Sequence, residues 1–346
     1  MARLHPRKLV IAYFLISFLG MIVLMIRYGM NCPDSRSGNE DYRSILAKEE
    51  SPLKQREEEL NKLEKKLRTL DIILRRQFPN AVEYISQVLD DDIPTIYAVT
   101  PTHTRHVQKA ELTRLSNTFL HVKNFHWIVV EDSVARTPLV TNFLAQTGLK
   151  YTHLNIATPS RYKMGENDPH WLKPRGVEQR NLAVDWLREN VNVNTSPGVV
   201  YFADDDNTYS LQLFEEMRYT KRVSVWPVGI TGGLKFERPI VGDIGKVIGW
   251  YAAWRPQRPF AMDMAGFAVN LKLLVDHPTA AFDITVKRGY LESSLLSQLV
   301  KMEELEPKAD MCTKVLVWHT RTEKPKWKEE DAMIAKGKPS DPRVEV

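Results

Sequence analysis

The chain has 346 residues, with 48 Lys and Arg against 43 Asp and Glu, so its formal net charge is only +5. A charge balance so close to neutral argues against a nucleic-acid-binding protein and gives little support to any other acidic partner. The two cysteines, Cys32 and Cys312, are too few for a disulfide scaffold, although Cys32 is a candidate for a bridge between two chains.

The amino-terminal segment predicts a membrane anchor. The eighteen residues Leu9–Ile26 carry no charge, and ~20 apolar residues cross the ~30 Å hydrocarbon core of a bilayer as a helix. A cleaved signal peptide is the alternative, but no small-residue cleavage site follows this run. Basic residues gather before the run and only Arg27 follows it directly, which favours a cytosolic amino terminus. We expect a cytosolic tail over 1–8 and an anchor over 9–27.

Residues 28–92 are predicted to form a stem. Leucines at 53, 60, 67 and 74 repeat every seven residues, and Leu63 and Leu70 fill a second heptad position. With Glu and Lys on the flanks, this pattern predicts a coiled-coil-like helix over 51–78 that pairs with a second chain. A single amphipathic helix that lies against its own domain is the alternative.

Short apolar segments that alternate with helical patterns follow from Pro94 onward. We expect strands at 95–100, 127–132, 152–158 and 199–206. Strands that alternate with helices predict an α/β fold with a mainly parallel sheet covered on both faces. Ligands bind at the carboxyl ends of such strands, where we expect Thr100, Asp132 and the acidic residues 204–206.

The second half of the chain is less regular and is expected to supply the other wall of a cleft. No GxGxxG or P-loop pattern follows the first strand, which gives little support to a dinucleotide or kinase-like site. Asn194 opens the sequence “NTS” and is a candidate glycosylation acceptor.

The stretch “GVVYFADDDNTYS” places three carboxylates side by side after a buried strand. An EF-hand calcium loop is one explanation, but Tyr209 stands where that loop requires Gly. A solvated turn with one Asp capping a helix at 210–218 is another. The third is a Mg²⁺ or Mn²⁺ ion held by one or two carboxylates and completed by phosphate oxygens of a substrate. The third explanation fits an enzyme that uses a nucleotide sugar.

Six motifs follow in order: “PRGVEQRN”, “FADDDNTYS”, “SVWPVG”, “RPFAMDMAGFAV”, “LESSLLSQL” and “VLVWHTRTEKPK”. Together they resemble the animal β-1,3-glucuronosyltransferases over roughly 94–346. The resemblance implies a GT-A fold, with a half over 93–222 that binds a uridine-diphosphate donor and an acceptor-binding half over 223–346. It also implies a Mn²⁺-dependent, homodimeric type II protein of the Golgi membrane with a lumenal catalytic domain.

The resemblance further implies the residues that bind UDP-glucuronate. Asp206 corresponds to the direct Mn²⁺ ligand, and Arg288 corresponds to a position that reads the carboxylate of the donor sugar. His103 is a departure, because the family often has Tyr there to stack on the base. The other positions that match donor-binding residues are Pro101, Thr102, Asp132, Arg175, Arg180, Asp204, Asp205, His319 and Arg321.

Glu292 corresponds to the catalytic base of the family, which deprotonates the acceptor hydroxyl during an inverting displacement. Desolvation would help a carboxylate in this role by raising its pKa. The acceptor-binding positions of the family correspond to Glu237, Trp254, Arg258 and Asp263.

The expected reaction moves glucuronic acid to O3 of a terminal β-galactose, on the galactosyl-galactosyl-xylosyl linker of proteoglycans. N-acetyllactosamine-type glycans of glycoproteins or glycolipids are the alternative acceptors, because Arg255 and Glu329 depart from the residues of proteoglycan-type members. A membrane-tethered lectin without catalysis is a third reading, but it would need a damaged metal or base position.

Overall fold

The computed structural model describes residues 62, 66, 93–165, 168, 172–341 and 344. The predicted anchor, Cys32 and most of the stem lie outside these residues, and the two described stem residues, Lys62 and Lys66, are helical. None of the helices within the described part has the length and apolar character of a membrane span. The chain divides into the units 1–82 and 83–346, and the second unit holds the fold described below.

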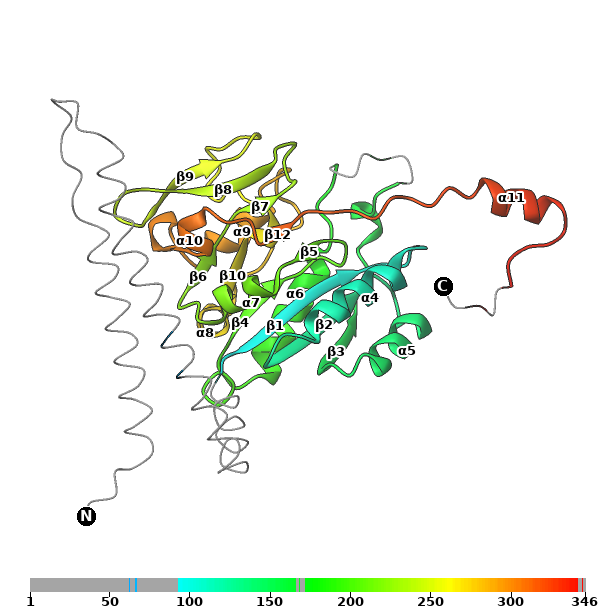
Figure 1. Cartoon of the computed structure of the whole chain (residues 1–346), viewed down its shortest axis with the longest axis horizontal. Helices are drawn as coiled ribbons and strands as arrows, with labels where there is room; N and C mark the ends of the chain where they lie inside the picture. The colour runs from blue at the N-terminus through cyan, green and yellow to red at the C-terminus, as the bar shows by residue number, and fades with distance from the viewer. Residues whose placement is uncertain are drawn as a thin grey trace, which may run out of the picture. The chain divides into compact units, whose positions relative to one another are not determined.

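A seven-stranded sheet forms the centre of this unit, in the order β11-β6-β10-β4-β1-β2-β3 (Figure 1). Strands β4, β1, β2 and β3 run parallel to one another, whereas β10 runs antiparallel to both β4 and β6. The predicted α/β fold with a mainly parallel sheet is therefore confirmed. The strands are β1 (Thr95–Thr102), β2 (Phe125–Glu131), β3 (Tyr151–Asn155), β4 (Gly198–Phe202), β6 (Val223–Val225), β10 (Phe267–Asn270) and β11 (Glu306–Pro307).

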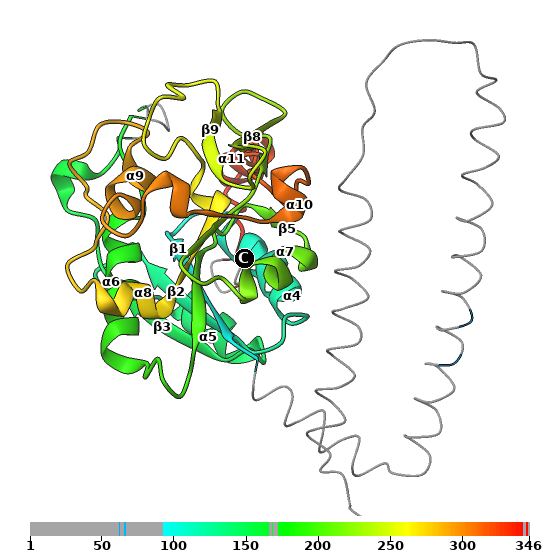
Figure 2. The ribbon, with the colours of Figure 1, turned by 90° about the vertical axis from the view of Figure 1, so that its left-hand side faces the viewer.

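Helices cover both faces of this sheet (Figures 1 and 2). Successive strand residues point to opposite faces, so in β1 Ile96 and Ala98 pack in one core cluster while Tyr97 and Val99 pack in the other. The first cluster contains α4 (Gln108–Phe119), α5 (Pro138–Gln146) and α7 (Leu211–Arg218), and the second contains α6 (Val177–Asn190), α8 (Leu271–Asp276) and α9 (Leu291–Leu296).

A second sheet, in the order β5-β12-β7-β8-β9, stands beside the triplet. Because β12 pairs with β5, Trp318 lies opposite Thr208, and the Thr320 hydroxyl donates to the Asp206 carbonyl at 2.7 Å. Residues more than 100 positions apart thus meet at the end of β4. The strands of this sheet are β5 (Thr208–Tyr209), β7 (Val228–Gly229), β8 (Phe236–Val241), β9 (Val247–Tyr251) and β12 (Val317–Trp318).

The segment that leads into β12 has an unusual backbone. All four residues of α10 (Ala309–Cys312) have φ between 53° and 60°, a left-handed turn that costs non-glycine residues roughly 1–2 kcal/mol each. Burial of Ala309 and Cys312 fixes this turn in the core, and burial also raises the pKa of the Cys312 thiol to about 12. The remaining short elements are η1 (Ser160–Tyr162), η2 (Met264–Gly266), η3 (Met302–Glu304) and α11 (Lys328–Ala335).

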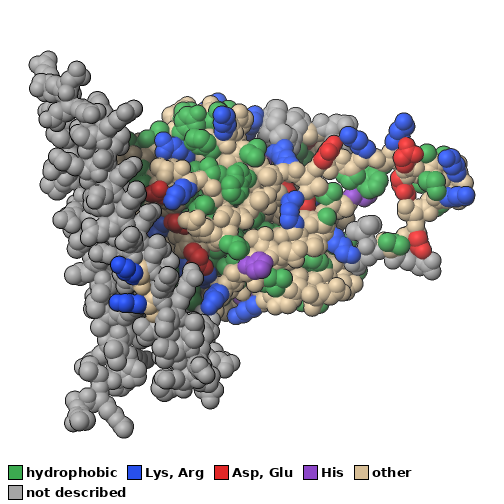
Figure 3. All heavy atoms as spheres, viewed as in Figure 1, with side chains coloured by type: hydrophobic (Ala, Val, Ile, Leu, Met, Phe, Trp, Pro, Cys, Tyr) green, Lys and Arg blue, Asp and Glu red, His purple; other side chains and the backbone are tan. Residues whose placement is uncertain are grey.

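Charged side chains are dispersed over the described surface shown in Figure 3, with Asp and Glu among the Lys and Arg. This agrees with the small net charge of the sequence. Helix α11 buries none of its side chains and follows an extended segment away from the sheets (Figure 1).

One local expectation was wrong, and one alternative for the acidic triplet is excluded. Thr100 is fully buried within β1 and accepts a hydrogen bond from Trp127 Nε1, because β1 continues to Thr102. The helix after the acidic triplet is capped by the Ser210 hydroxyl, which accepts from Gln212 N. An Asp is therefore not needed to begin that helix, and the triplet is left for other contacts.

Candidate active site

The buried strand β4 delivers the acidic triplet to the carboxyl edge of the parallel sheet. All five residues of β4 are buried, so Asp204–Asp206 are the first polar side chains beyond the core. Asp205 accepts from Thr102 Oγ1 at 2.7 Å and forms an ion pair with Arg105 at 2.7 Å. Asp204 pairs with Arg180 Nη2 at 2.6 Å. Two of the three carboxylates are thus held by protein cations.

The third carboxylate has a different environment. No hydrogen bond within the described part of the chain engages the Asp206 side chain, whose backbone carbonyl instead accepts from Arg114 and Thr320. Burial, and then repulsion by Asp204 and Asp205, raise the pKa of Asp206 to about 6. A half-buried carboxylate next to like charges fits a divalent cation. The described residues contain no ready-made cage of three or more His, Cys, Asp and Glu, so such an ion would need oxygen ligands from a substrate.

The ends of β1 and β2 bring together the residues predicted to bind uridine. Desolvation and the charge of Arg105 lower the pKa of His103, whereas Asp205 and Asp132 raise it, which places this imidazole among these groups. Arg175 also acts on the His103 pKa. Pro101 lies close to the turn before α6, because a side chain at Gly176 would come within 3.1 Å of it. The structure therefore gathers these predicted donor residues at one edge.

His319 follows β12 and connects the triplet to the second half of the chain. Its Nδ1 lies 3.3 Å from the Asp263 carboxylate, and this contact raises the His319 pKa despite burial. Burial tends to raise the pKa of Asp263, but the contact with His319 together with hydrogen bonds from Ala265 N and Thr231 makes the net shift downward. Arg321 NH2 lies 3.3 Å from His319 Nε2. His319, which is predicted to bind the donor, is therefore in direct contact with Asp263, which is predicted to bind the acceptor.

Glu292 lies in the first turn of α9, where the two sets of residues meet. The pKa of Glu292 is raised to about 7, chiefly by burial and also by repulsion from Asp263, against the opposing effects of a backbone hydrogen bond, Arg258 and Arg180. A carboxylate with a pKa near neutrality is suited to accept a proton from a hydroxyl group. The arrangement therefore supplies a candidate general base between a donor edge and an acceptor surface.

Three guanidinium groups surround the Trp254 ring. Arg255, Arg258 and Arg288 lie 4.9, 5.0 and 5.6 Å from the ring centre. Arg258 is fixed by the Arg255 carbonyl, which accepts from its Nε at 3.2 Å, and it also donates to the Gly289 carbonyl. Cation–π contacts of this kind orient the ring, and Trp254 is half-buried rather than packed into the core.

Glu237 completes the acceptor cluster from β8. It is 7% exposed, and burial followed by repulsion from Asp263 raises its pKa, while Arg258 lowers it. The four predicted acceptor residues and Glu292 thus interact with one another. Their roles in binding stay predictions.

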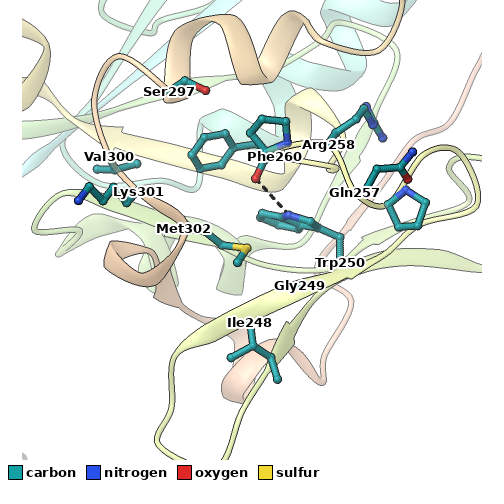
Figure 4. A pocket seen from close by; sticks show the side chains of 12 residues that line it. Ile248, Gly249, Trp250, Gln257, Arg258, Phe260, Ser297, Val300, Lys301 and Met302 are labelled. Atoms are coloured by element: carbon teal, nitrogen blue, oxygen red, sulfur yellow. Dashed lines mark hydrogen bonds between the residues drawn. The ribbon is translucent and has the colours of Figure 1, made fainter.

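A pocket of about 500 Å³ adjoins this cluster (Figure 4). Its walls include Ile248 and Trp250 of β9 and the loop that carries Arg258. Trp250 Nε1 donates to the Pro259 carbonyl at 3.2 Å and fixes the loop on the strand. One wall of the pocket therefore fixes the loop from which Arg258 reaches the acceptor cluster.

Sequence reasoning missed two residues of the site. Arg105 binds Asp205, Glu111 and the His103 carbonyl, and Thr231 donates to Asp263 at 3.0 Å. A buried carboxylate needs a partner, but the sequence does not show which of the many Arg and Thr residues supplies it. The candidate glycosylation residue Asn194 is exposed in a turn.

Comparison with known proteins identifies related chains. The model of glycosyltransferase family 43 matches residues 115–323. The human protein named galactosylgalactosylxylosylprotein 3-beta-glucuronosyltransferase 3 is 49% identical, over 99% of this chain and 100% of that protein. The rat protein named galactosylgalactosylxylosylprotein 3-beta-glucuronosyltransferase 1 is 58% identical, over 74% of this chain and 76% of that protein.

Among solved structures, residues 1–349 of S. aureus TarS align with a TM-score of 0.42 and 14% identity, over 65% of this chain and 60% of that one. The family match covers more than half of the chain, and the human relative aligns along nearly its whole length. The chain belongs to glycosyltransferase family 43.

Proposed function

We propose that this protein transfers glucuronic acid from UDP-glucuronate to O3 of a terminal β-galactose on the galactosyl-galactosyl-xylosyl linker of proteoglycans. The observation that supports the proposal is the environment of Glu292: its pKa is raised to about 7, and both Arg180, assigned to the donor, and Arg258, assigned to the acceptor, lie near enough to lower it. The names of relatives 49% and 58% identical to this chain support the same activity.

The proposed reaction is a single displacement that inverts the anomeric carbon. Glu292 accepts the proton of the acceptor O3 hydroxyl as this oxygen forms the new bond, and the diphosphate leaves from the opposite side of the sugar ring. Arg258 lies close enough to affect the charge of Glu292, so it limits the cost of a carboxylate in this buried position. Trp254 presents a ring face and Glu237 a carboxylate for the galactose.

On the donor side, Arg175, His319 and Arg321 supply positive or donating groups for the diphosphate. Arg288 lies beside Trp254 and is proposed to bind the carboxylate of the glucuronic acid, which would select this sugar over neutral ones. Asp132 and His103 would hold the uracil ring.

Asp206 fits a Mn²⁺ ion because its half-buried carboxylate repels two neighbours and makes no side-chain hydrogen bond with the described residues. When bound, the ion would neutralise the charge that develops on the leaving diphosphate. Asp204 and Asp205 are committed to Arg180 and Arg105, so they would stabilise the loop rather than complete the ion's ligands.

The anchor and the stem lead to two further proposals. The anchor at 9–27, with its uncharged run Leu9–Ile26 and a cytosolic amino terminus, would make this a single-pass type II protein. The resemblance to the glucuronosyltransferases supports the Golgi as the membrane and its lumen as the location of the catalytic unit. The heptad leucines over 51–78 support a homodimer, to which Cys32 could add a bridge. Light scattering of the full chain before and after reduction would test both the dimer and the bridge.

Acceptor choice is the part of the proposal that a direct assay decides. We expect transfer from UDP-glucuronate to a galactosyl-galactosyl-xyloside with Mn²⁺, and at least tenfold slower transfer to N-acetyllactosamine. Comparable rates on both acceptors would refute the narrow acceptor range. Donor binding without transfer to either acceptor would favour a lectin.

One observation favours the alternative acceptors. Arg255 is exposed and lies over Trp254, where it changes the surface that an acceptor sugar would contact. If N-acetyllactosamine is preferred, Arg255→Glu should shift the ratio of the two rates toward the xyloside.

A further inference from the structure

A buried side-chain amide on α6 contacts the edge of the sheet where the uracil ring of the donor is expected, but it has no assigned part in the reaction. The Gln179 side chain is fully buried. Its Nε2 donates to the Ile156 carbonyl at 2.8 Å and to Thr158 Oγ1 at 3.3 Å, whereas its Oε1 has no partner among the described residues. A buried amide with an unsatisfied oxygen is costly. An apolar residue would fill this place in the core at lower cost, so the two donated bonds call for an explanation.

One of these two bonds reaches Thr158, which in turn binds the carboxylate of Asp132. Thr158 N donates to one carboxylate oxygen of Asp132 at 2.7 Å, and Thr158 Oγ1 donates to the other at 2.7 Å. Because the Thr158 hydroxyl donates its proton to Asp132, it can only act as the acceptor of the hydrogen bond from the Gln179 amide. The three side chains therefore form one directional series from Gln179 through Thr158 to Asp132.

The series ends where the base of the donor is expected. Asp132 acts on the pKa of His103 together with Arg175, so it belongs to the group at the ends of β1 and β2. A carboxylate only accepts hydrogen bonds. It therefore favours a base with N–H at ring position 3, as in uracil, and repels cytosine, whose N3 is an acceptor.

We infer that Gln179 is a positioning residue: through Thr158 it fixes the Asp132 carboxylate in the orientation that accepts the N3–H of uracil and rejects cytosine nucleotides. The inference rests on the proposed use of a uridine-diphosphate donor. It assigns the choice of base to a side chain that does not touch the base, carried by α6 rather than by the strand ends.

The test measures binding of UDP and CDP by calorimetry, with Mn²⁺ present, for the wild type, Thr158→Val and Gln179→Met. Thr158 is only partly buried, so its isosteric replacement should fold even if the Gln179 variant does not. We expect UDP binding to weaken about tenfold or more, with a much smaller change for CDP. At saturating UDP-glucuronate, kcat and the acceptor KM should stay near their wild-type values.

Asn181→Leu is the matched control. Asn181 lies on the same helix, but its amide binds the backbone of Phe282 at 2.8 and 2.9 Å, away from Asp132. The control should leave the UDP-to-CDP preference unchanged. If Thr158→Val weakens the binding of UDP and CDP equally, or if Gln179→Met leaves the UDP-to-CDP preference unchanged, the inference is overturned. Transfer by the wild type would still leave the proposed function standing in that case. A wild type that binds neither nucleotide would instead sink the proposed function.

Discussion

Replacing Glu292 with Gln tests the proposed base most directly. The pKa of Glu292 is about 7 instead of its usual 4.5, chiefly because of burial. The base must be ionised, so kcat/KM of the wild type should fall about tenfold for each pH unit below 7. Glu292→Gln should lose roughly 10²–10⁴-fold in activity, and its residual rate should not depend on the ionisation of this position.

The same change has a consequence for stability. An acid with a raised folded-state pKa holds its proton more tightly in the folded chain than in the unfolded chain, so its ionisation destabilises the fold as pH rises. This cost is absent below about pH 4.5 and complete above about pH 7. The gap between these two values corresponds to at most roughly 3 kcal/mol. Glu292→Gln should therefore raise the free energy of unfolding at pH 8 and not at pH 4.

Urea unfolding between pH 4 and 8 measures the effect on stability. Steady-state rates over the part of this range in which the protein is folded measure the effect on activity. Glu303→Gln on η3 replaces an exposed Glu and serves as a control that should change neither. A Glu292→Gln protein that keeps full activity, or a stability gain that is the same at all pH values, would refute the reasoning.

Three further outcomes are expected. Asp206→Asn should abolish the Mn²⁺ dependence of UDP binding in calorimetry, and metal-dependent binding by this variant would contradict the assignment. Arg105→Ala leaves Asp205 and Glu111 without their cation, so we expect weaker UDP binding and a lower melting temperature, whereas a variant with both values unchanged would exclude a role for this ion pair. Met311→Gly should stabilise the protein by about 0.5–1 kcal/mol, because Met311 has φ +54° and Gly adopts that region without strain. The control Met333→Gly in α11 should not stabilise the protein. A loss of stability in both variants would show that the turn is unstrained.

The local elements of the donor half were predictable from the sequence. “VVYFA” is an apolar run followed by three charges, and such a run is stable only as a buried strand whose end meets water. The periodic residues Leu112, Leu115 and Phe119 likewise mark a single helix face, and all three are buried in the core. These signals are short-range, so the residues that carry them are neighbours in the chain.

Tertiary structure decided which polar groups act together. Asp263, Glu292 and His319 come from three separate segments of the second half, and Asp263 interacts with both of the others only because these segments pack together. The chemistry of the residues alone did not divide the roles of the three aspartates, which only the family resemblance assigned, because the partners Arg105 and Arg180 come from different elements. The sequence by itself therefore determined the strand and its acidic end. Long-range packing brings Arg105 and Arg180 there, so Asp205 and Asp204 have a cation partner and Asp206 is the carboxylate proposed for a metal ion.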